Sequence, residues 1–263
     1  MAGKPILVVP DIHQDARFLR ECLRIPAQTP VEEILFLGDL LDSKSREGRL
    51  PDTIRTVLRE VHSVLERQDP PATLLWGNHD WKYWVFRDEL AGHRDPAASD
   101  HEFFLVRDLS PLTADLLFEE NLGGPGPALD LWKDHAVLAA ERRGWLITHA
   151  GVHPDLWPGG TDLADGVDRL NRTMEELRDE CASLDGHPLL GAGPARGGFH
   201  EIGGPLWLDF NEEFVDDLPF PQIVGHTRCP DVLRSGRSYC LDACQQVCAL
   251  LYPDGNLEFR VVT

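Results

Sequence analysis

The stretch from Thr73 to Asp80, Thr-Leu-Leu-Trp-Gly-Asn-His-Asp, decides the fold of this chain. A short apolar run that is typical of a buried strand stops at a glycine, and an amide, an imidazole and a carboxylate follow directly. From average residue usage, Gly-Asn-His-Asp should occur by chance in on the order of one in a thousand chains of this length. Open α/β sheets bind ligands at the carboxyl ends of their strands, so the stretch predicts a strand that ends in a functional site.

Four other short apolar runs end in polar motifs in the same way. They are Pro5–Val9 before Asp11-Ile12-His13, Ile34–Leu37 before Gly38-Asp39-Leu40-Leu41-Asp42, Trp145–Thr148 before His149-Ala150-Gly151, and Gln222–Val224 before Gly225-His226-Thr227. Carboxylates, imidazoles and an amide are ligands that divalent Mn, Fe or Zn accept, in contrast to the thiolates of structural zinc sites. The five motifs therefore indicate a metal centre.

The composition limits the class of protein. With 263 residues, 42% hydrophobic and 26% charged, the chain can fold as one large α/β domain. We expect a single domain over residues 1–263, with insertions at about 81–143 and 152–220 that shape the mouth of the site. No early apolar stretch with a cleavage site and no apolar run of about 18 residues is visible, so we expect no export signal, no membrane span and a cytoplasmic location. The net charge of -19 argues against stable binding to nucleic acid or to an anionic membrane.

The six cysteines allow a zinc site, disulfides or free thiols. Cys240, Cys244 and Cys248 recur every four residues, which differs from the paired spacing of zinc sites and scatters side chains in a strand. Reduced, mostly buried thiols in a reducing cytoplasm fit best.

The remaining patterns predict alternating strands and helices followed by a terminal hairpin. The expected helices are Asp15–Leu23, Asp52–Arg67 and Leu163–Leu184, and the expected C-terminal strands are Ser238–Leu241, Val247–Leu251 and Leu257–Val262. Pro253-Asp254-Gly255-Asn256 predicts the turn of the hairpin. The alternation in the first half predicts βαβ units and a largely parallel sheet.

The five motifs, in this order, resemble those of the calcineurin-like metallophosphoesterase superfamily. Three segments are similar to the phosphoprotein phosphatase and diadenosine tetraphosphatase branch: His149-Ala150-Gly151 to H-[GA]-G, Pro205–Asp209 to L-W-x-D/R, and Ser238–Asp242 to Y-x-I-D. The resemblance implies a four-layer α/β/β/α sandwich of two mixed β-sheets flanked by helices.

The resemblance also implies two divalent metal ions per chain, with Mn favoured and Fe, Zn or Ni as alternatives. The first ion would be held by Asp11, His13 and Asp39, and the second by Asp39, Asn78, His149 and His226. Side chains two apart on an extended segment point the same way, so Asp11 and His13 can hold one ion. A carboxylate such as Asp39 can bridge two ions about 3.5–4 Å apart.

Two further residues receive catalytic roles from the resemblance. His79 would donate a proton to the leaving oxygen, and Asp42 would orient that imidazole. The structural alternative for Asp42 is a helix N-cap, and Asp80 is expected to brace the turn. The implied reaction is in-line attack of a metal-bridging hydroxide on phosphorus, without a phosphoenzyme.

The chain departs from the family pattern at two positions. The branch usually reads G-D-x-x-D-R-G, with an arginine that clamps phosphate, whereas this chain has Ser43-Lys44. A phosphate still favours a bidentate guanidinium, so Arg228, Arg196 and Arg46 are candidates, with Arg228 the best placed. Arg228 also stands where many diesterase-type members have the second histidine of G-H-x-H.

The favoured function is hydrolysis of a phosphomonoester on a nucleotide, a small molecule or a Ser/Thr phosphoprotein. The alternative is a phosphodiesterase or a dinucleoside-polyphosphate pyrophosphohydrolase. A non-catalytic scaffold is disfavoured because Asn78 and His79 are both present.

Four aromatic residues begin the first insertion: Trp81, Tyr83, Trp84 and Phe86. They could stack on a nucleobase, but the i, i+3 spacing of Trp81 and Trp84 favours one buried helical face.

Overall fold

The computed structural model describes residues 3–91, 109–122, 126–180 and 186–262. Its first sheet has six strands in the order β11-β10-β1-β2-β3-β4. These strands are β1 (Ile6–Val9), β2 (Glu33–Phe36), β3 (Ala72–Leu75), β4 (Ala136–Val137), β10 (Val247–Leu251) and β11 (Leu257–Val261). Strands β1 to β4 are parallel, and β10 and β11 pair antiparallel at one edge.

The second sheet has five strands in the order β5-β6-β7-β9-β8. They are β5 (Ala139–Arg142), β6 (Trp145–Thr148), β7 (Gln222–Val224), β8 (Leu233–Ser235) and β9 (Ser238–Cys240). Its central strands β6, β7 and β9 are parallel, and its two edge strands are antiparallel to them. Both sheets are therefore mixed, each with a parallel centre.

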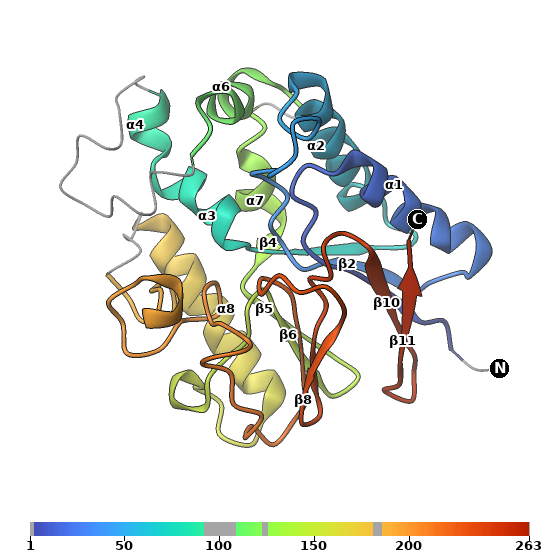
Figure 1. Ribbon diagram of the computed structural model, residues 1–263, viewed down its shortest axis with the longest axis vertical. Coiled ribbons are helices and arrows are strands. Elements are labelled where there is room, and N and C mark those ends of the chain that lie inside the picture. The colour runs from blue at the N-terminus through green and yellow to red at the C-terminus, as the bar shows by residue number, and fades with distance from the viewer. Residues whose placement is uncertain (1–2, 92–108, 123–125, 181–185, 263) are drawn as a thin grey trace.

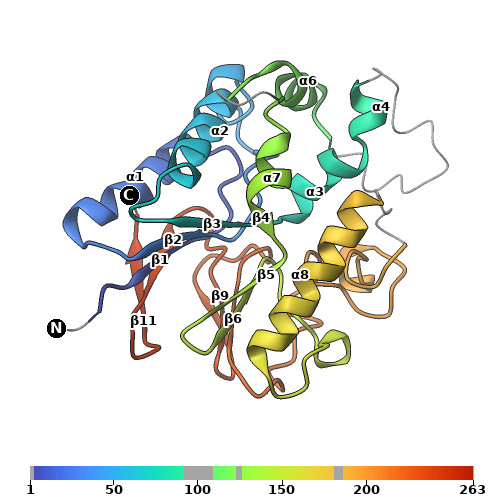
Figure 2. The ribbon, with the colours of Figure 1, turned by 180° about the vertical axis from the view of Figure 1, so that it is seen from behind.

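Helices cover the outer faces of the two sheets (Figures 1 and 2). They are α1 (Ala16–Gln28), α2 (Pro51–Leu65), α3 (Asn78–Val85), α4 (Arg87–Ala91), α6 (Pro111–Glu119), α7 (Asp130–His135) and α8 (Leu163–Asp179). Helices α1 and α2 lie over the first sheet, and α8 runs along β5 and β6 of the second (Figure 2). Short 3₁₀ turns occur at Pro154–Leu156 and Pro194–Arg196.

The alternation of side chains along β1 shows how the layers form. Ile6 and Val8 belong to the apolar cluster between the sheets, together with Ile147 and Ile223 of the second sheet. Leu7 and Val9 point the other way and pack in the cluster that contains the buried faces of α1 and α2. The same strand is buried on both faces, which confirms the four-layer arrangement.

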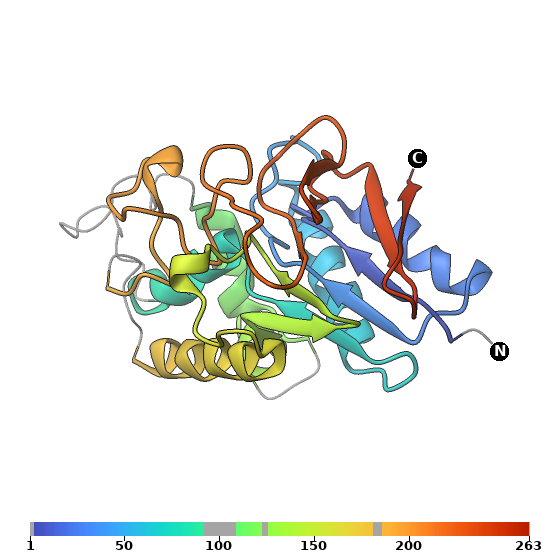
Figure 3. The same ribbon diagram turned by 90° about the horizontal axis from the view of Figure 1, so that it is seen from below.

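Most predicted elements are present with small shifts in their bounds. Helix α1 continues to Gln28, five residues further than predicted. Pro26 does not end it earlier, because it lies in the last turn, where its missing N–H removes only one helical hydrogen bond. The terminal hairpin is confirmed by the antiparallel pairing of β10 and β11, which lies beside β1 (Figure 3). Helix α8 starts at Leu163 as predicted and ends at Asp179, and residues 181–184 of that prediction lie outside the described residues.

The expected insertions contain more regular structure than the sequence predicted. Strands β4 and β5 and helices α6 and α7 all fall within 81–143. Residues 92–108, 123–125 and 181–185, with part of the Gly123–Pro127 bend and Cys181, lie outside the described residues. The organisation as a single domain with two insertions stays a prediction.

The four aromatic residues after Asp80 are packed in the core. Trp81 and Tyr83 are 0% exposed, and Trp84 and Phe86 are 7% and 6% exposed. The ring of Trp81 meets that of Trp76 edge to face, with 5.1 Å between centroids. Side chains buried to this degree cannot stack on a bound base, so the packing interpretation holds.

The five described cysteines are free thiols, and four of them are buried. Two of them fasten the loops that follow β7 and β9. Cys229 Sγ donates to the carbonyl of Asp242 (3.2 Å), and Cys240 Sγ donates to the carbonyl of Gly225 (3.0 Å). Within the described residues, no helix is long and apolar enough to cross a membrane.

Candidate metal centre

Five strand ends bring the predicted ligands together. Strands β1, β2, β3, β6 and β7 each end one to three residues before a predicted ligand residue. The loops are then joined by backbone hydrogen bonds, because the amides of Ile12 and His13 both donate to the carbonyl of Asp39 (3.0 and 2.8 Å). In the second sheet, the Gly225 amide donates to the carbonyl of His149 (2.7 Å).

Four of the predicted site residues adopt left-handed backbone conformations. The φ angles of His13, Asp39, Asp42 and His226 are 46°, 49°, 63° and 65°. Residues with side chains rarely adopt this conformation, and it persists where surrounding contacts fix it. The extended geometry expected for Asp11 and His13 is therefore wrong: His13 lies in a turn, although both side chains still reach the same cluster.

Two motif glycines allow the strand ends to approach each other closely. A Cβ atom on Gly77 would lie 2.2 Å from Oδ1 of Asp39, and one on Gly225 would lie 2.0 Å from Oδ2 of Asp11. Any larger residue at either position would collide with a buried carboxylate.

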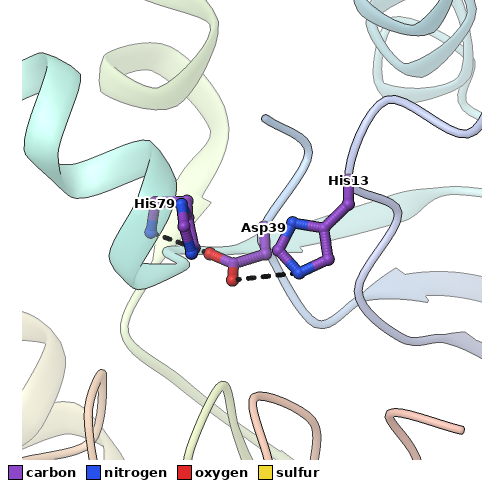
Figure 4. Close-up of side chains that lie close together, drawn as sticks. All are labelled: His13, Asp39 and His79. Atoms are coloured by element: carbon purple, nitrogen blue, oxygen red, sulfur yellow. Dashed lines mark hydrogen bonds and ion pairs between the residues drawn. The ribbon is translucent and has the colours of Figure 1, made fainter. Parts of the chain in front are cut away.

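The first cluster is built around Asp39, a residue that is 1% exposed. Its carboxylate faces His13 (Figure 4). Oδ2 of Asp39 lies 3.8 Å from Nε2 of His13, and Oδ1 accepts a hydrogen bond from the backbone amide of His79 (2.9 Å). Asp11 and His13 also have ligand atoms within 4.8 Å of each other and of Asp242.

The second cluster surrounds the amide oxygen of Asn78. This Oδ1 atom lies 3.0 Å from Nε2 of His149 and 2.9 Å from Nδ1 of His226. Nε2 of His149 also lies 3.5 Å from Oδ2 of Asp39, so one carboxylate faces both clusters. The structure thus brings together all six residues that the sequence predicted as ligands.

The hydrogen bonds behind two histidines suit a bound cation. Nδ1 of His149 lies 2.8 Å from the carbonyl of Leu37, and Nδ1 of His13 lies 2.9 Å from the carbonyl of Leu41. A carbonyl only accepts, so each Nδ1 carries the proton, and each neutral ring turns a lone pair on Nε2 toward Asp39. Lone pairs that face a carboxylate repel unless a cation lies between them. This donor set, held by carbonyls behind each ring, fits a metal ion.

The shifted pKa values agree with this interpretation. Burial lowers the pKa values of His13 and His149 below 6.5, which keeps both rings neutral near pH 7. Burial raises the pKa of Asp11 well above 3.8, and the carboxylates of Asp242 and Asp39 raise it further. For Asp39, burial opposes ionisation, but imidazole charges at His149, His79 and His13 outweigh it and lower the pKa to about 2. Asp39 is therefore ionised near neutral pH, which is the state in which a carboxylate binds a metal ion.

His79 lies at the start of α3 and is held by a chain of polar side chains. Its Nδ1 atom lies 2.9 Å from Oδ2 of Asp42, and Oδ1 of Asp42 accepts a hydrogen bond from the Tyr83 hydroxyl (2.6 Å). Burial, followed by the charge of Asp42, raises the pKa of Tyr83 well above 10, so the phenol stays a donor. The predicted pair of His79 and Asp42 is therefore in contact. The hydrogen bond from Tyr83 was missed, because the sequence suggested only packing or base stacking for this residue.

The structure also decides the structural roles considered for Asp42 and Asp80. The nearest helix after Asp42 begins at Pro51 with Leu50 as its N-cap, so Asp42 caps no helix. Oδ1 of Asp80 accepts from the amides of Leu40 (3.0 Å) and Leu41 (3.3 Å). Asp80 thus braces the turn that carries Asp39.

The three candidate arginines differ in their surroundings. Nη2 of Arg196 forms an ion pair with Oδ2 of Asp209 and donates to Oγ1 of Thr227, both at 2.9 Å. Its buried Nε has no hydrogen-bond partner among the described residues. The charge of Arg196 contributes to the lowered pKa of His226, after the larger effect of burial. Arg228 is exposed and donates through Nε to Sγ of Cys244 (3.2 Å), and Arg46 is exposed on the loop before α2.

Comparison with known proteins agrees with this geometry. The chain belongs to the calcineurin-like phosphoesterase family, whose model matches residues 4–182, and it is a metal-dependent phosphoester hydrolase. Its fold is similar to that of a cold-active protein-tyrosine phosphatase from a psychrophilic Shewanella species, with a TM-score of 0.55, 16% identity, and coverage of 98% of this chain and 80% of that chain. It is also similar to hypothetical protein PH1004 from Pyrococcus horikoshii OT3, with a TM-score of 0.50, 12% identity, and coverage of 98% and 87%. No curated protein sequence matches this chain.

Metal content should distinguish the shared ligand from an unshared one. We expect Asp39→Ala to bind neither ion, because Oδ2 of Asp39 faces both clusters. His226→Ala should lose mainly one ion, since it borders only the second cluster. Elemental analysis of Mn-loaded, desalted protein measures both, with thermal unfolding of the metal-free proteins as the folding control. Two ions retained by Asp39→Ala would contradict the shared role.

Proposed function

We propose that this protein is a phosphomonoesterase with a binuclear metal centre. Asp11, His13 and Asp39 hold the first ion. The second ion is held by Asp39, Asn78, His149 and His226. Mn is the favoured metal, because a set of carboxylates, imidazoles and an amide without thiolate suits it. When bound, the ions supply the activation of a water molecule and the neutralisation of phosphoryl charge.

The observation that carries the proposal is the hydrogen-bonded chain from Tyr83 through Asp42 to His79, directly beside Asp39. Asp42 accepts through one oxygen from Tyr83 and presents the other to Nδ1 of His79, which fixes the ring. Nε2 of His79 is then the atom that gives a proton to the leaving oxygen of an ester. A leaving alkoxide needs this proton.

Cationic side chains around the site favour a doubly charged monoester over a singly charged diester. Arg196 stands beside the second cluster with an unpartnered Nε, and a guanidinium suits phosphate oxygens. Arg228 occupies the position of the histidine that many diesterase-type relatives have in this motif. We therefore assign the phosphate clamp to Arg196.

A cavity of about 390 Å³ beside His79 accommodates the leaving group. Its lining is mostly polar and includes Gln14, Lys44, Arg49 and Thr113. Lys44 and Arg49 would also suit a leaving group that carries its own phosphate. This observation supports a second candidate function, a dinucleoside-polyphosphate pyrophosphohydrolase.

The proposal extends to the domain organisation and the cellular location of the enzyme. We infer one domain with two insertions at the site mouth and a reducing, cytoplasmic environment, which the free thiols of five cysteines support. Phosphorylated small molecules, nucleotides and Ser/Thr phosphoproteins are the candidate substrates.

A substrate panel tests the function directly. The Mn-loaded protein should hydrolyse p-nitrophenyl phosphate and a nucleoside monophosphate or phosphopeptide faster than bis-p-nitrophenyl phosphate. Released phosphate and p-nitrophenol measure the rates, with metal-free protein as the control. Preference for a dinucleoside polyphosphate would select the second candidate, and no turnover of any ester by protein that holds both ions would overturn the proposal.

Substitutions along the chain from Tyr83 to His79 should separate proton donation from metal binding. We expect His79→Ala to keep its metal and to lose about 10²–10⁴ in kcat on an alkyl phosphate, the usual contribution of a general acid. Tyr83→Phe should lose less, about tenfold, because it removes one hydrogen bond to Asp42.

The leaving group provides the control for this series. p-Nitrophenol departs without a proton, so the loss for His79→Ala should shrink on p-nitrophenyl phosphate. An equal loss on both esters would mean that His79 positions the substrate and donates no proton.

Replacement of Arg196 should weaken substrate binding without loss of metal. Arg196→Ala should raise KM for a monoester by about tenfold or more, and Arg196→Lys should recover only part, because lysine lacks the bidentate fork. Asp209→Asn is the matched control: it removes the ion pair with Arg196 but keeps the guanidinium. A KM that rises equally in Asp209→Asn would show that Arg196 has only a structural role.

A further inference from the structure

We propose that Asp242 is a further protein ligand of the first metal ion, beside Asp11, His13 and Asp39. The inference rests on the proposed binuclear centre and adds a residue to it. Asp242 lies in the loop after β9, and β9 is the neighbour of β7 in the second sheet.

Asp242 leaves its sheet at the same end as the established cluster. β7 and β9 are parallel neighbours, with Val224 opposite Cys240, so their carboxyl ends lie side by side. His226 follows β7 by two residues, and Asp242 follows β9 by two residues. The two sequence-distant loops therefore deliver a histidine and a carboxylate to one edge.

The carboxylate of Asp242 reaches the first cluster. One of its oxygens, an oxygen of Asp11 and a ring nitrogen of His13 all lie within 4.8 Å of one another. Asp242 is only 2% exposed, and its Oδ1 atom is buried without a hydrogen-bond partner among the described residues. A buried carboxylate oxygen without a partner is costly, and a cation between these three side chains would satisfy it.

Hydrogen bonds fix the backbone of this loop beside the first cluster. Its carbonyl accepts from both the amide (3.0 Å) and the thiol (3.2 Å) of Cys229. The Leu241 amide donates to the carbonyl of Val224 (2.8 Å). Three residues further on, Nε2 of Gln245 donates to the carbonyl of Asp11 (3.3 Å), which joins the two carboxylate-bearing loops directly.

The charges around Asp242 also favour a cation. Asp11, Asp39 and Asp242 are three buried carboxylates in one region, and burying like charges is unfavourable unless positive charge accompanies them. The charges of Arg228 and Lys44 act on Asp242, but Arg228 directs its Nε to Sγ of Cys244 and Lys44 is exposed. A bound ion would therefore be the compensating charge nearest to the three carboxylates.

The consequence is a difference between the two ion sites. The first would have three carboxylates and one imidazole. The second would have one shared carboxylate, one amide and two imidazoles. More carboxylates make the first site harder and more negative, so it should bind Mn more tightly than the second. Asp242 thereby takes the place of the second histidine of G-H-x-H, which is Arg228 in this chain.

Metal binding by Asp242→Asn tests the assignment. Asparagine keeps the size of the side chain but removes its charge. The metal-free protein is titrated with Mn, and binding is measured by calorimetry and by electron paramagnetic resonance of free Mn. The dissociation constant of the tighter site should rise by about tenfold or more in the variant. The exposed Asp217→Asn is the control for loss of one surface charge and should bind as the wild type does.

Thermal unfolding gives a second readout that is independent of activity. Mn should raise the melting temperature of the wild type, since ligands stabilise the state that binds them, and the rise should be smaller in Asp242→Asn. In excess chelator, the variant should melt at or above the wild-type temperature, because one of three mutually repelling carboxylates is gone.

The outcomes separate this inference from the proposed function. Wild-type protein that binds no divalent ion would overturn both. Two ions bound with wild-type affinity by Asp242→Asn would overturn only the role of Asp242. If the variant fails to fold, a crystal structure of Mn-loaded wild type decides: anomalous density within about 2.5 Å of Oδ1 of Asp242 supports ligation. An ion separated from Asp242 by a water molecule would refute it.

Discussion

Hydrogen bonds from the backbone of one motif to the carboxylate of another hold the whole centre in place. The His226 amide donates to Oδ1 of Asp11, and the His79 amide donates to Oδ1 of Asp39, both at 2.9 Å. The partners of these bonds are 215 and 40 residues apart in sequence. Each bond commits one carboxylate to the protein, and for Asp39 the other oxygen is left to face the histidines. The fold therefore fixes the acidic groups before any cation arrives, which is the preorganisation that metal and catalytic sites require.

These bonds also explain why the centre belongs to neither sheet alone. Of the proposed ligands, the first sheet supplies Asp11, His13, Asp39 and Asn78 from its strand ends, and the second supplies His149, His226 and Asp242. The apolar layer that contains Val8, Leu37 and Ile223 sets the distance between these ends. A change in the packing of the sheets would move the two halves of the ligand set relative to each other, so the core between the sheets acts directly on the geometry of the site.

The sequence predicted the parts of the site that depend on local pattern. Ligands that follow short buried strands were identifiable because parallel strands end at one edge, and glycines such as Gly77 marked the close approaches. The left-handed turn at His13 was not predictable, since it depends on hydrogen bonds to the carbonyl of Asp39. Tyr83 was considered only for core packing or base stacking, because a helical pattern cannot show where a hydroxyl points. Asp242 had the same signal as the other proposed ligands, a polar side chain just after a strand, but its segment was interpreted only as a strand and as a likeness to relatives.

The acidity of the chain and the cations near the site have complementary effects. A net charge of -19 repels anions in general, whereas Arg196, Lys44 and Arg49 lie at the second cluster and at the cavity beside His79. At moderate salt, ionic screening limits the range over which surface charges act to about 10 Å. A phosphate that reaches the mouth of the site is therefore influenced mainly by these nearby groups. Selectivity for a dianion then depends on a few local charges together with the bound ions. For the proposed substrates, the same few charges would decide which end lies at the metals and which lies at His79.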